Sequence, residues 1–328
     1  MIDLTSTLDG VEWWDNHRID TINTCKRKAL LHYIFSSDNS PDGTGLATSV
    51  GEGADFGTAM HAAHAVYYAL WGKAEEETRR ALAIQKFIQV HGKYFWYIDD
   101  ENQRQPRQPR KNNHTIDNGV KMLDVFYDRM IAEDMYWRPL ETELIMIVII
   151  KPRPHETFEP IVYVAPVDGM MERTRDKALY VHEFKHVAGV DREVAHLKIS
   201  RQLSGYIYAA REWYENVDGA LISVLGTAIT KEEYRRDLVN RTPQMIESWR
   251  NQTIQIVTEW RVLEREFRAR LKNEGRDLNL AAAMDRFVQH TNSCMDYGQC
   301  TFYDICLYGL GKTQGWGKNE WNPLKRGV

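Results

Sequence analysis

Two neighbouring apolar segments that carry acidic residues and a lysine constrain this sequence more than any other feature. The first reads Val-Asp-Gly-Met-Met-Glu at 167–172, and the second reads Ala-Leu-Tyr-Val-His-Glu-Phe-Lys at 178–185. A polar turn separates them, which predicts two adjacent strands with Asp168 close to Glu183. Because side chains alternate along a strand, Glu183 and Lys185 should point to the same face. The sequence therefore predicts two carboxylates and one ammonium group together on a sheet.

This combination is what a hydrolytic divalent-metal site needs. The carboxylates can hold the cation, and the lysine can steady an attacking water or a phosphate oxygen. An isolated Glu-x-Lys is more often part of a solvated strand, since charged residues are common in any chain. The position of Glu183 and Lys185 at the end of an apolar strand, after Asp168 and Gly169 on the preceding one, favours the site.

Three further polar residues fit the same site. His61 follows Gly57 on an apolar, helix-like segment, and imidazole suits manganese better than magnesium. His64 lies one turn later, so either histidine fits, and a purely structural histidine is the alternative. We expect Gly57 to allow another backbone to approach closely. Gln202 and Tyr206 are four apart on a predicted helix and share one face, where they could orient a phosphate or form a plain surface pair.

The four cysteines of the chain are Cys25, Cys294, Cys300 and Cys306. The N-terminus has no basic and apolar leader, which predicts an intracellular, cytoplasmic protein in which disulfides are not expected. Four cysteines in a reducing compartment suggest a four-thiolate site that holds either zinc or an iron–sulfur cluster. The lack of a close Cys-x-x-Cys pair favours a cluster that ties the two ends of the chain together.

The charge balance neither requires nor excludes a nucleic-acid partner. The formal net charge of the 328 residues is −4, so any contact with phosphates must come from a local basic surface. Candidates are Arg27 and Lys28 beside the first cysteine, and Arg104, Arg107 and Arg110 in an expected exposed loop over 102–113. A solvated basic helix start is the alternative for the first pair.

The order of the expected elements predicts an α/β protein. Helices are expected over 11–36 (including Trp13 and Trp14), 56–71, 75–89, 115–134, 194–214 and 242–273. Strands are expected over 141–151, 161–172, 178–186 and 219–229, with a loop over 37–55 and an irregular tail from about 287. This order favours a mixed sheet flanked by helices, because a meander of strands follows the first helices and is itself followed by a helix, a strand and a helix. The longest apolar run, 144–150, is too short to span a membrane.

Taken together and in this order, the motifs resemble the PD-(D/E)XK nuclease superfamily, in its RecB-like branch with a four-cysteine iron–sulfur cluster. That branch includes the CRISPR-associated RecB-like exonucleases and AddB-type nuclease domains. The resemblance covers nearly the whole chain: Cys25 with its basic followers, Gly57-x-x-x-His61, Asp168-Gly, Glu183-Phe-Lys185, Gln202-x-x-x-Tyr206 and the three C-terminal cysteines. The family trio begins with Cys-x-x-Cys, whereas here both gaps hold five residues.

The resemblance implies a restriction-endonuclease-like fold and a DNA-cleaving activity that depends on Mg²⁺ or Mn²⁺. It implies metal ligands at His61, Asp168, Glu183 and the Phe184 carbonyl, with Lys185 as the catalytic lysine and Gln202 and Tyr206 on the phosphate side. Glu141 or Glu143 could add a further carboxylate. A 4Fe–4S cluster would be held by Cys25, Cys294, Cys300 and Cys306.

The resemblance also implies one nuclease domain over 1–328. A mainly helical region at 1–135 would carry the first cysteine and the His61 motif, 136–235 would form the catalytic sheet, and 236–328 would form a long helix and the cluster-binding tail. The implied function is an exonuclease on single-stranded DNA ends in recombination, repair or replication, with a helicase or recombination protein as partner and no membrane. Endonucleolytic cleavage also fits these residues.

Two other functions are compatible with the same residues. The first is a DNA-end-binding subunit of a larger complex that has the nuclease fold without its activity; the presence of all the expected catalytic residues argues against it. The second is a zinc-stabilised structural protein whose Asp168, Glu183 and Lys185 are ordinary charges.

Overall fold

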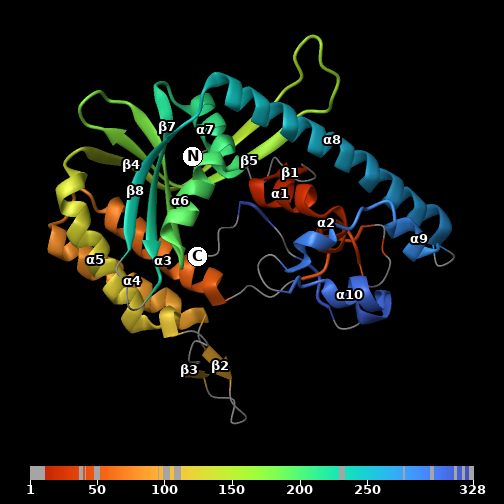
Figure 1. The fold of residues 1–328 in the computed structure, drawn as a ribbon, viewed down its shortest axis with the longest axis horizontal. Helices are drawn as coiled ribbons and strands as arrows, with labels where there is room; N and C mark the ends of the chain where they lie inside the picture. Colours follow the sequence, from red (N-terminus) through yellow and green to blue (C-terminus); the bar gives the residue numbers. More distant parts are fainter. Residues whose placement is uncertain are drawn as a thin grey trace. The chain divides into compact units, whose positions relative to one another are not determined.

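The computed structural model describes residues 12–36, 40, 42–47, 52–94, 96–98, 104–106, 112–228, 233–275, 278–295, 299–313, 316–319 and 322–324 (Figure 1). The chain divides into two compact units. Unit 1 comprises Met1–Ser49, Val148–Val164 and Ser248–Pro323, and unit 2 comprises Val50–Ile147, Ala165–Glu247 and Leu324–Val328. Both units are therefore assembled from segments that lie far apart in the sequence. The predicted division at 135 and 235 within one domain stays a prediction.

The main sheet has six strands of mixed direction in the order β1-β5-β6-β7-β8, with β4 also paired to β5. β5 and β6 are antiparallel, β6 and β7 are parallel, and β7 and β8 are antiparallel. The parallel pair requires a crossover, which two helices between β6 and β7 provide. The strands are β1 (Trp13–Trp14), β4 (Trp137–Ile150), β5 (Ile161–Arg173), β6 (Leu179–Val187), β7 (Val217–Gly226) and β8 (Tyr234–Asn240).

In unit 2, helices cover both faces of the sheet (Figure 1). α3 (Glu52–Ala69) and α5 (Ile116–Asp134) pack on one face, with α4 (Glu76–Tyr94) against these two helices. α6 (Val190–Ile199) and α7 (Arg201–Trp213) pack on the other face. Large buried side chains of the first three helices, including Phe56, Tyr67, Phe87 and Phe126, form one core with Phe184 of β6. Burial of these aromatic side chains is the main stabilising contribution on this face.

Unit 1 is mainly helical. It holds α1 (Asn16–Thr24), α2 (Lys26–Tyr33), most of α8 (Pro243–Glu274), α9 (Leu280–Met284) and α10 (Tyr303–Tyr308), with 3-10 turns at Thr291–Met295 and Leu310–Thr313. Asp15 caps α1, since its carboxylate accepts a hydrogen bond from the Arg18 amide at 2.7 Å. Arg250 of α8 donates two hydrogen bonds to Glu156, both 2.7 Å long. No helix in the described part of the chain is long and apolar enough to cross a bilayer.

The predicted mixed sheet between helices is confirmed, and the four expected strands all exist. Several local predictions were wrong. Trp13 and Trp14 form β1, which pairs with Val162 and Tyr163 of β5, instead of continuing a helix. The predicted helix over 194–214 is two helices, because Ser200 ends α6 and caps α7 through its hydroxyl.

Three other regions also differ from the sequence-based expectation. The expected loop over 102–113 contains β3 (Arg104–Pro106), which pairs with β2 (Trp96–Ile98), and a 3-10 turn at Asn112–His114. β8 was not predicted, because Arg235, Arg236 and Asp237 mask its alternation. The tail after 287 is partly helical, with α10 as its longest described helix.

Candidate active site

The antiparallel pairing of β5 with β6 brings Asp168 to Glu183, as the sequence predicted. The register pairs Gly169 with His182, so Asp168 is adjacent to Glu183 in the next position. The Asp168 carboxylate accepts a hydrogen bond from the Phe184 amide at 2.7 Å through Oδ2. This bond fixes the carboxylate against the backbone of β6, close to the Phe184 carbonyl that the resemblance proposes as a ligand.

Glu183 and Lys185 lie on one face of β6. Lys185 Nζ donates to Glu183 Oε1 at 2.5 Å, and Glu183 is only 2% exposed. The prediction that strand alternation places these two side chains together is therefore confirmed. The second carboxylate oxygen of Glu183, Oε2, is buried and has no hydrogen-bond partner. A buried carboxylate oxygen without a partner is costly unless a cation or a donor reaches it.

The backbone of β4 lies very close to its partner strand β5 beside Asp168. A side chain at Gly169 would lie 2.7 Å from the Glu141 carbonyl oxygen, so only glycine fits there. Glu143, two residues further along β4, has a positive φ of 52° and lines the same pocket as Asp168. Non-glycine residues seldom adopt this conformation, and where they do the strain is often found at functional sites. Of the two β4 carboxylates considered from the sequence, Glu143 is the one that lines this pocket.

His61, on α3, is the histidine that meets Asp168. Its Nδ1 lies 3.0 Å from Asp168 Oδ1, where a protonated Nδ1 donates to the carboxylate. His64 instead stacks on the Phe184 ring, with centroids 4.1 Å apart, and its Nε2 lies 3.2 Å from Nε2 of His186. The expectation for Gly57 was wrong, since a side chain there would meet nothing within 4 Å.

The charges of this site are strongly coupled. Burial raises the pKa of Glu183, and the nearby Asp168 charge adds to this against the opposing charge of Lys185. Burial disfavours the charged forms of Lys185 and His61, but the charges of Glu183 and Asp168 outweigh it, so the pKa of both bases is raised. Two buried acids thus lie beside an amine and an imidazole whose charged forms they favour. A bound cation could take the place of the imidazolium proton.

Gln202 and Tyr206 form the predicted pair on α7. Gln202 Nε2 donates to the Tyr206 hydroxyl at 3.0 Å, and both residues line the pocket that contains Asp168, Glu183 and Lys185. The Ser200 cap sets the start of α7 and therefore the direction in which this pair points. The structure thus brings the sequence-predicted polar residues of the site, other than the alternatives His64 and Glu141, into one pocket of about 480 Å³.

The pocket also has lining residues that sequence reasoning did not select. They come from α3, α4 and β4: Thr58, Ala62, Ala65, Val66, Ala69, Lys86, Val90 and Thr142. The four alanine and valine positions on α3 follow helical spacing and look like core in the sequence, so no signal separated them. Lys86 is one lysine among many. Only the packing of α3 against α4 reveals that it belongs to the pocket.

The donor set fits a hard divalent cation, although it is not closed into a cage. Carboxylates and one imidazole suit Mg²⁺ or Mn²⁺, and the unpartnered Glu183 Oε2 is a ready ligand atom. In the tautomer protonated at Nδ1, His61 donates to the Asp168 carboxylate, and its Nε2 is available to another ligand. Within the described residues, no three His, Cys, Asp or Glu side chains lie close enough to hold a metal ion as they stand.

The four cysteines are all in unit 1 and line one small pocket. None of the four forms a disulfide, and Cys25 is buried at the start of α2, where its sulfur accepts the Lys28 amide at 3.4 Å. Burial raises the pKa of the Cys306 thiol to about 11, and the other three cysteines contribute to this shift. The sulfurs share a pocket, but in their present positions they do not converge into a metal-binding group.

The predicted basic surface is only partly described. Arg27 donates to the Phe287 carbonyl and to Asp285, so its guanidinium links α2 to the segment that follows α9. Lys28 lines the cysteine pocket. Arg104 lies on β3, and Arg107 and Arg110 lie outside the described residues. Contact of these residues with DNA stays a prediction.

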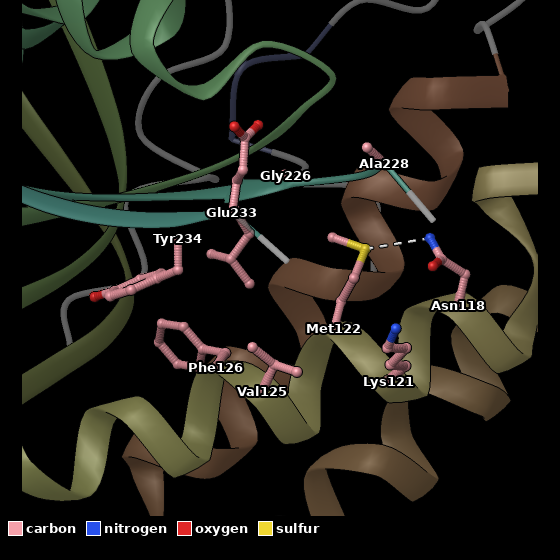
Figure 2. Close-up of a pocket in the computed structure, with 10 residues that line it drawn as sticks. Asn118, Lys121, Met122, Val125, Phe126, Gly226, Ala228, Glu233 and Tyr234 are labelled. Carbon is pink, nitrogen blue, oxygen red and sulfur yellow. Dashed lines mark hydrogen bonds between the residues drawn. The ribbon is translucent and has the colours of Figure 1, made fainter. Parts of the chain in front are cut away.

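A second pocket in unit 2, between α5 and the ends of β7 and β8, contains none of the predicted site residues (Figure 2). Met122 and Phe126 form its apolar wall, and Asn118 donates a hydrogen bond to the Met122 sulfur at 3.5 Å. Figure 2 shows the Glu233 carboxylate turned away from the Lys121 ammonium. The charged groups of this second pocket therefore do not converge on a common point, whereas those around Asp168 do.

No family model matches the sequence, and no curated protein matches it either. Among solved structures, the chain is similar to a candidate exonuclease from Eubacterium rectale, with 10% identity, coverage of 82% of this chain and 94% of that one, and a TM-score of 0.37. It is also similar to SSO0001, with 14% identity, 61% and 74% coverage and a TM-score of 0.27. These values are too low to indicate an activity, so the functional case below is made from the side chains.

Proposed function

We propose that the protein is a metal-dependent deoxyribonuclease that hydrolyses phosphodiester bonds in the pocket around Asp168, Glu183 and Lys185. The observation that carries this proposal is the buried Glu183 carboxylate. One of its oxygens is bound by Lys185, and the other has no partner. With Asp168 and His61 adjacent, this arrangement suits a cation and an anionic oxygen of a substrate together.

The side chains have distinct roles in this mechanism. Lys185, held in place by Glu183, orients the attacking water and offsets negative charge that builds on the phosphate oxygens. Asp168 is held rigid by the Phe184 amide, so its other oxygen is directed toward His61. Gln202 and Tyr206 offer neutral hydrogen-bonding groups that position the phosphate. Preorganised groups of this kind lower the barrier because they need little rearrangement during the reaction.

A divalent cation would be held by His61, Asp168, Glu183 and the Phe184 carbonyl. When bound, Mg²⁺ or Mn²⁺ supplies Lewis-acid polarisation of the phosphate and a more acidic water. The support is the donor set and the unpartnered Glu183 oxygen. Glu143, which has a positive φ within β4, lines the same pocket and is available to orient one of these groups.

We further propose that Cys25, Cys294, Cys300 and Cys306 hold a 4Fe–4S cluster with a structural role. The support is that four cysteines from both ends of the sequence, none of them in a disulfide, line one pocket of unit 1. Closing so long a loop would restrict the unfolded chain considerably. The sulfurs must move together on loading, which the short helices and turns of this region allow more readily than a sheet would.

The substrate proposed from the family resemblance is single-stranded DNA trimmed from an end during recombination, repair or replication. No Gly-x-x-x-x-Gly-Lys-Ser/Thr motif occurs in the sequence, so ATP-driven unwinding would come from a helicase or recombination partner. Whether cleavage starts at an end is testable with closed circular single strands, which an exonuclease leaves intact.

The direct test is digestion of end-labelled single- and double-stranded oligonucleotides with Mn²⁺, with Mg²⁺ and with a chelator. We expect cleavage only when a divalent cation is present. The Asp168→Asn variant should lose cleavage and also bind Mn²⁺ more weakly by calorimetry, because it removes a carboxylate charge from the site.

The matched control is Lys198→Ala. Lys198 lies on α6, is about half-exposed and pairs with Asp237 outside the pocket, so its loss should leave cleavage unchanged. An unmodified protein that binds Mn²⁺ but cuts neither strand type would contradict the nuclease proposal and favour a DNA-end-binding subunit.

A further inference from the structure

α3 has two faces of different character. One face, with Phe56, Met60, Ala63 and Tyr67, is fully buried in the core of unit 2. The opposite face lines the candidate active site, and its members follow the helical spacing of three and four: Thr58, His61, Ala62, Ala65, Val66 and Ala69. These pocket-facing residues are only half-buried or exposed.

The pocket-facing side of α3 does not have the composition of a solvent-exposed helix face. A helix face turned to solvent usually carries charged and polar side chains. Here the accessible positions beyond His61 are Ala62, Ala65, Val66 and Ala69, which we call the alanine strip. Ligand-binding pockets usually have such an apolar wall together with a few polar groups. The small size of these side chains leaves the space above them open.

Lys86 gives the same pocket a positive charge on the α4 side. Within the described part of the chain its ammonium makes no hydrogen bond and no ion pair. The lysine is therefore not needed to neutralise an acid of its own protein. A lysine in this setting is suited to a phosphate group, which it contacts as a point charge.

A second observation points to a ligand in this pocket. Glu183 is 2% exposed, lines the same pocket and keeps one carboxylate oxygen without a partner. The pocket thus has a polar end around Glu183 and Lys185, an apolar wall on α3 and a separate cation on α4. This distribution matches a polynucleotide strand, which alternates anionic phosphates with apolar sugar and base surfaces.

We propose that the alanine strip and Lys86 form a track that holds one single strand of DNA next to the scissile phosphate. Lys86 contacts a phosphate adjacent to the one that reacts, and the sugars and bases lie on Ala62, Ala65 and Val66. This proposal rests on the proposed nuclease function and adds to it a substrate-binding surface. Lys86 is a positioning residue in this scheme.

The composition of the track predicts binding without sequence preference. Alanine and valine side chains have no hydrogen-bonding groups with which to read base edges, so base identity contributes little. The pocket volume of about 480 Å³ is in the range of small-molecule sites. Such a pocket suits the end of one strand better than a duplex, and single strands should bind more tightly than blunt duplexes.

The test is fluorescence anisotropy with a labelled oligothymidylate and with a blunt duplex, in the presence of a chelator so that no hydrolysis occurs. Lys86→Gln should weaken single-strand binding about tenfold. It should also lower the slope of log Kd against log salt by about 0.7, the value for one lost phosphate contact on a single strand. Lys93→Gln, at an exposed position on the same helix outside the pocket, is the matched control and should change neither value.

A second pair of variants separates charge from bulk on the strip. Ala65→Glu introduces a carboxylate that repels phosphates, whereas Ala65→Gln has nearly the same size without the charge. We expect the glutamate variant to bind several-fold more weakly than the glutamine variant. Since Ala65 is half-buried on a helix that tolerates both residues, unchanged thermal melting is the folding control.

The outcomes separate this proposal from the nuclease proposal. Single-strand binding that is the same in Lys86→Gln, Ala65→Glu and the unmodified protein overturns the track, as does equal affinity for duplex and single strand. If the variants weaken binding as expected while the unmodified protein cuts nothing with Mn²⁺, the track stands and the nuclease proposal fails.

Discussion

Two pockets of this protein, the candidate active site and the cysteine pocket, differ in how they are built. The one around Asp168, Glu183 and Lys185 stands on regular elements of unit 2, and hydrogen bonds of 2.5 to 3.0 Å already join its polar groups. The cysteine pocket of unit 1 stands on short helices and turns, and its sulfurs do not converge. Strands and long helices fix the directions of their side chains by their regular geometry. Side chains on short helices and turns are held less firmly, so a bound ligand is needed to fix their positions.

This difference predicts opposite sensitivities. Damage to the unit 2 pocket should remove chemistry with little effect on folding, because its elements are held by a large aromatic core. Damage to the cysteine pocket should remove stability gained from a ligand, with a smaller and indirect effect on chemistry. Each prediction below tests one side of this contrast.

The largest effect is expected from Lys185→Ala. Loss of one positioned group that stabilises transition-state charge typically costs about 100- to 1000-fold in rate, measured here as cleavage of labelled DNA with Mn²⁺. The melting temperature should change little, because Glu183 can take up a proton when its partner is removed; burial already raises the pKa of that carboxyl. Retained cleavage, or cleavage lost only together with folding, would break the contrast between the two pockets.

The unit 2 site shows what periodicity in a sequence can predict. The alternation of Glu183 with Lys185, the nearness of Asp168 and the four-residue spacing of Gln202 and Tyr206 all follow from local geometry, and each is found as expected. Local periodicity is a strong signal when one face of the element is buried. The choice between His61 and His64 needed the packing of α3, since both lie one turn apart on the same helix.

Features that depend on distant partners were not predictable. β1 is two residues long, and only its parallel pairing with β5 makes it a strand. The break at Ser200 depends on one hydroxyl, and β8 is obscured by charged residues that form ion pairs along its edge. Lys86 and Ala65 belong to the active-site pocket through helix packing, and nothing in their local sequence distinguishes them.

The next largest effect concerns loading of the cysteine pocket. Anaerobic reconstitution with iron and sulfide should stabilise the protein by about 2.7 kcal/mol when free ligand is at one hundred times its Kd. We expect a brown protein with a raised melting temperature, and no such rise in Cys300→Ser. Cleavage by the unloaded protein should persist at low temperature.

The outcome also identifies the ligand. A colourless preparation that contains zinc and melts at the higher temperature would replace the iron–sulfur proposal with a zinc site. Loading with neither metal, and equal melting of Cys300→Ser, would show that the cysteine pocket has no stabilising ligand.

A smaller effect is expected from two glycines of unit 2 that differ in their surroundings. Gly169→Ala should destabilise by about 1–3 kcal/mol, because its side chain would lie 2.7 Å from the Glu141 carbonyl. Gly57→Ala should stabilise by about 0.4–1 kcal/mol, because it lies within α3 and its side chain would meet nothing. Chemical denaturation measures both. Equal effects of the two substitutions would show that the β4 backbone at Glu141 does not lie as close to Gly169 of β5 as described.

The smallest effect is expected in unit 1, in the pH dependence of the Glu156–Arg250 pair. Two hydrogen bonds from Arg250 lower the pKa of Glu156 to about 2, against an ordinary value of 4.5. Because the folded pKa is the lower one, the stabilisation is fully present above pH 4.5 and is lost as the pH falls toward 2. Glu156→Gln removes the charge, so its melting temperature should lie below that of the unmodified protein at pH 7, and the gap should narrow on acidification.

The control for that pair is Glu159→Gln. Glu159 and Arg265 form an ion pair with both side chains 62% exposed, and exposed pairs contribute little. Its melting temperature should follow the unmodified protein at every pH. A gap for Glu156→Gln that stays constant between pH 7 and pH 3 would mean that packing around the Arg250 side chain, rather than the ionised carboxylate, holds this part of unit 1 together.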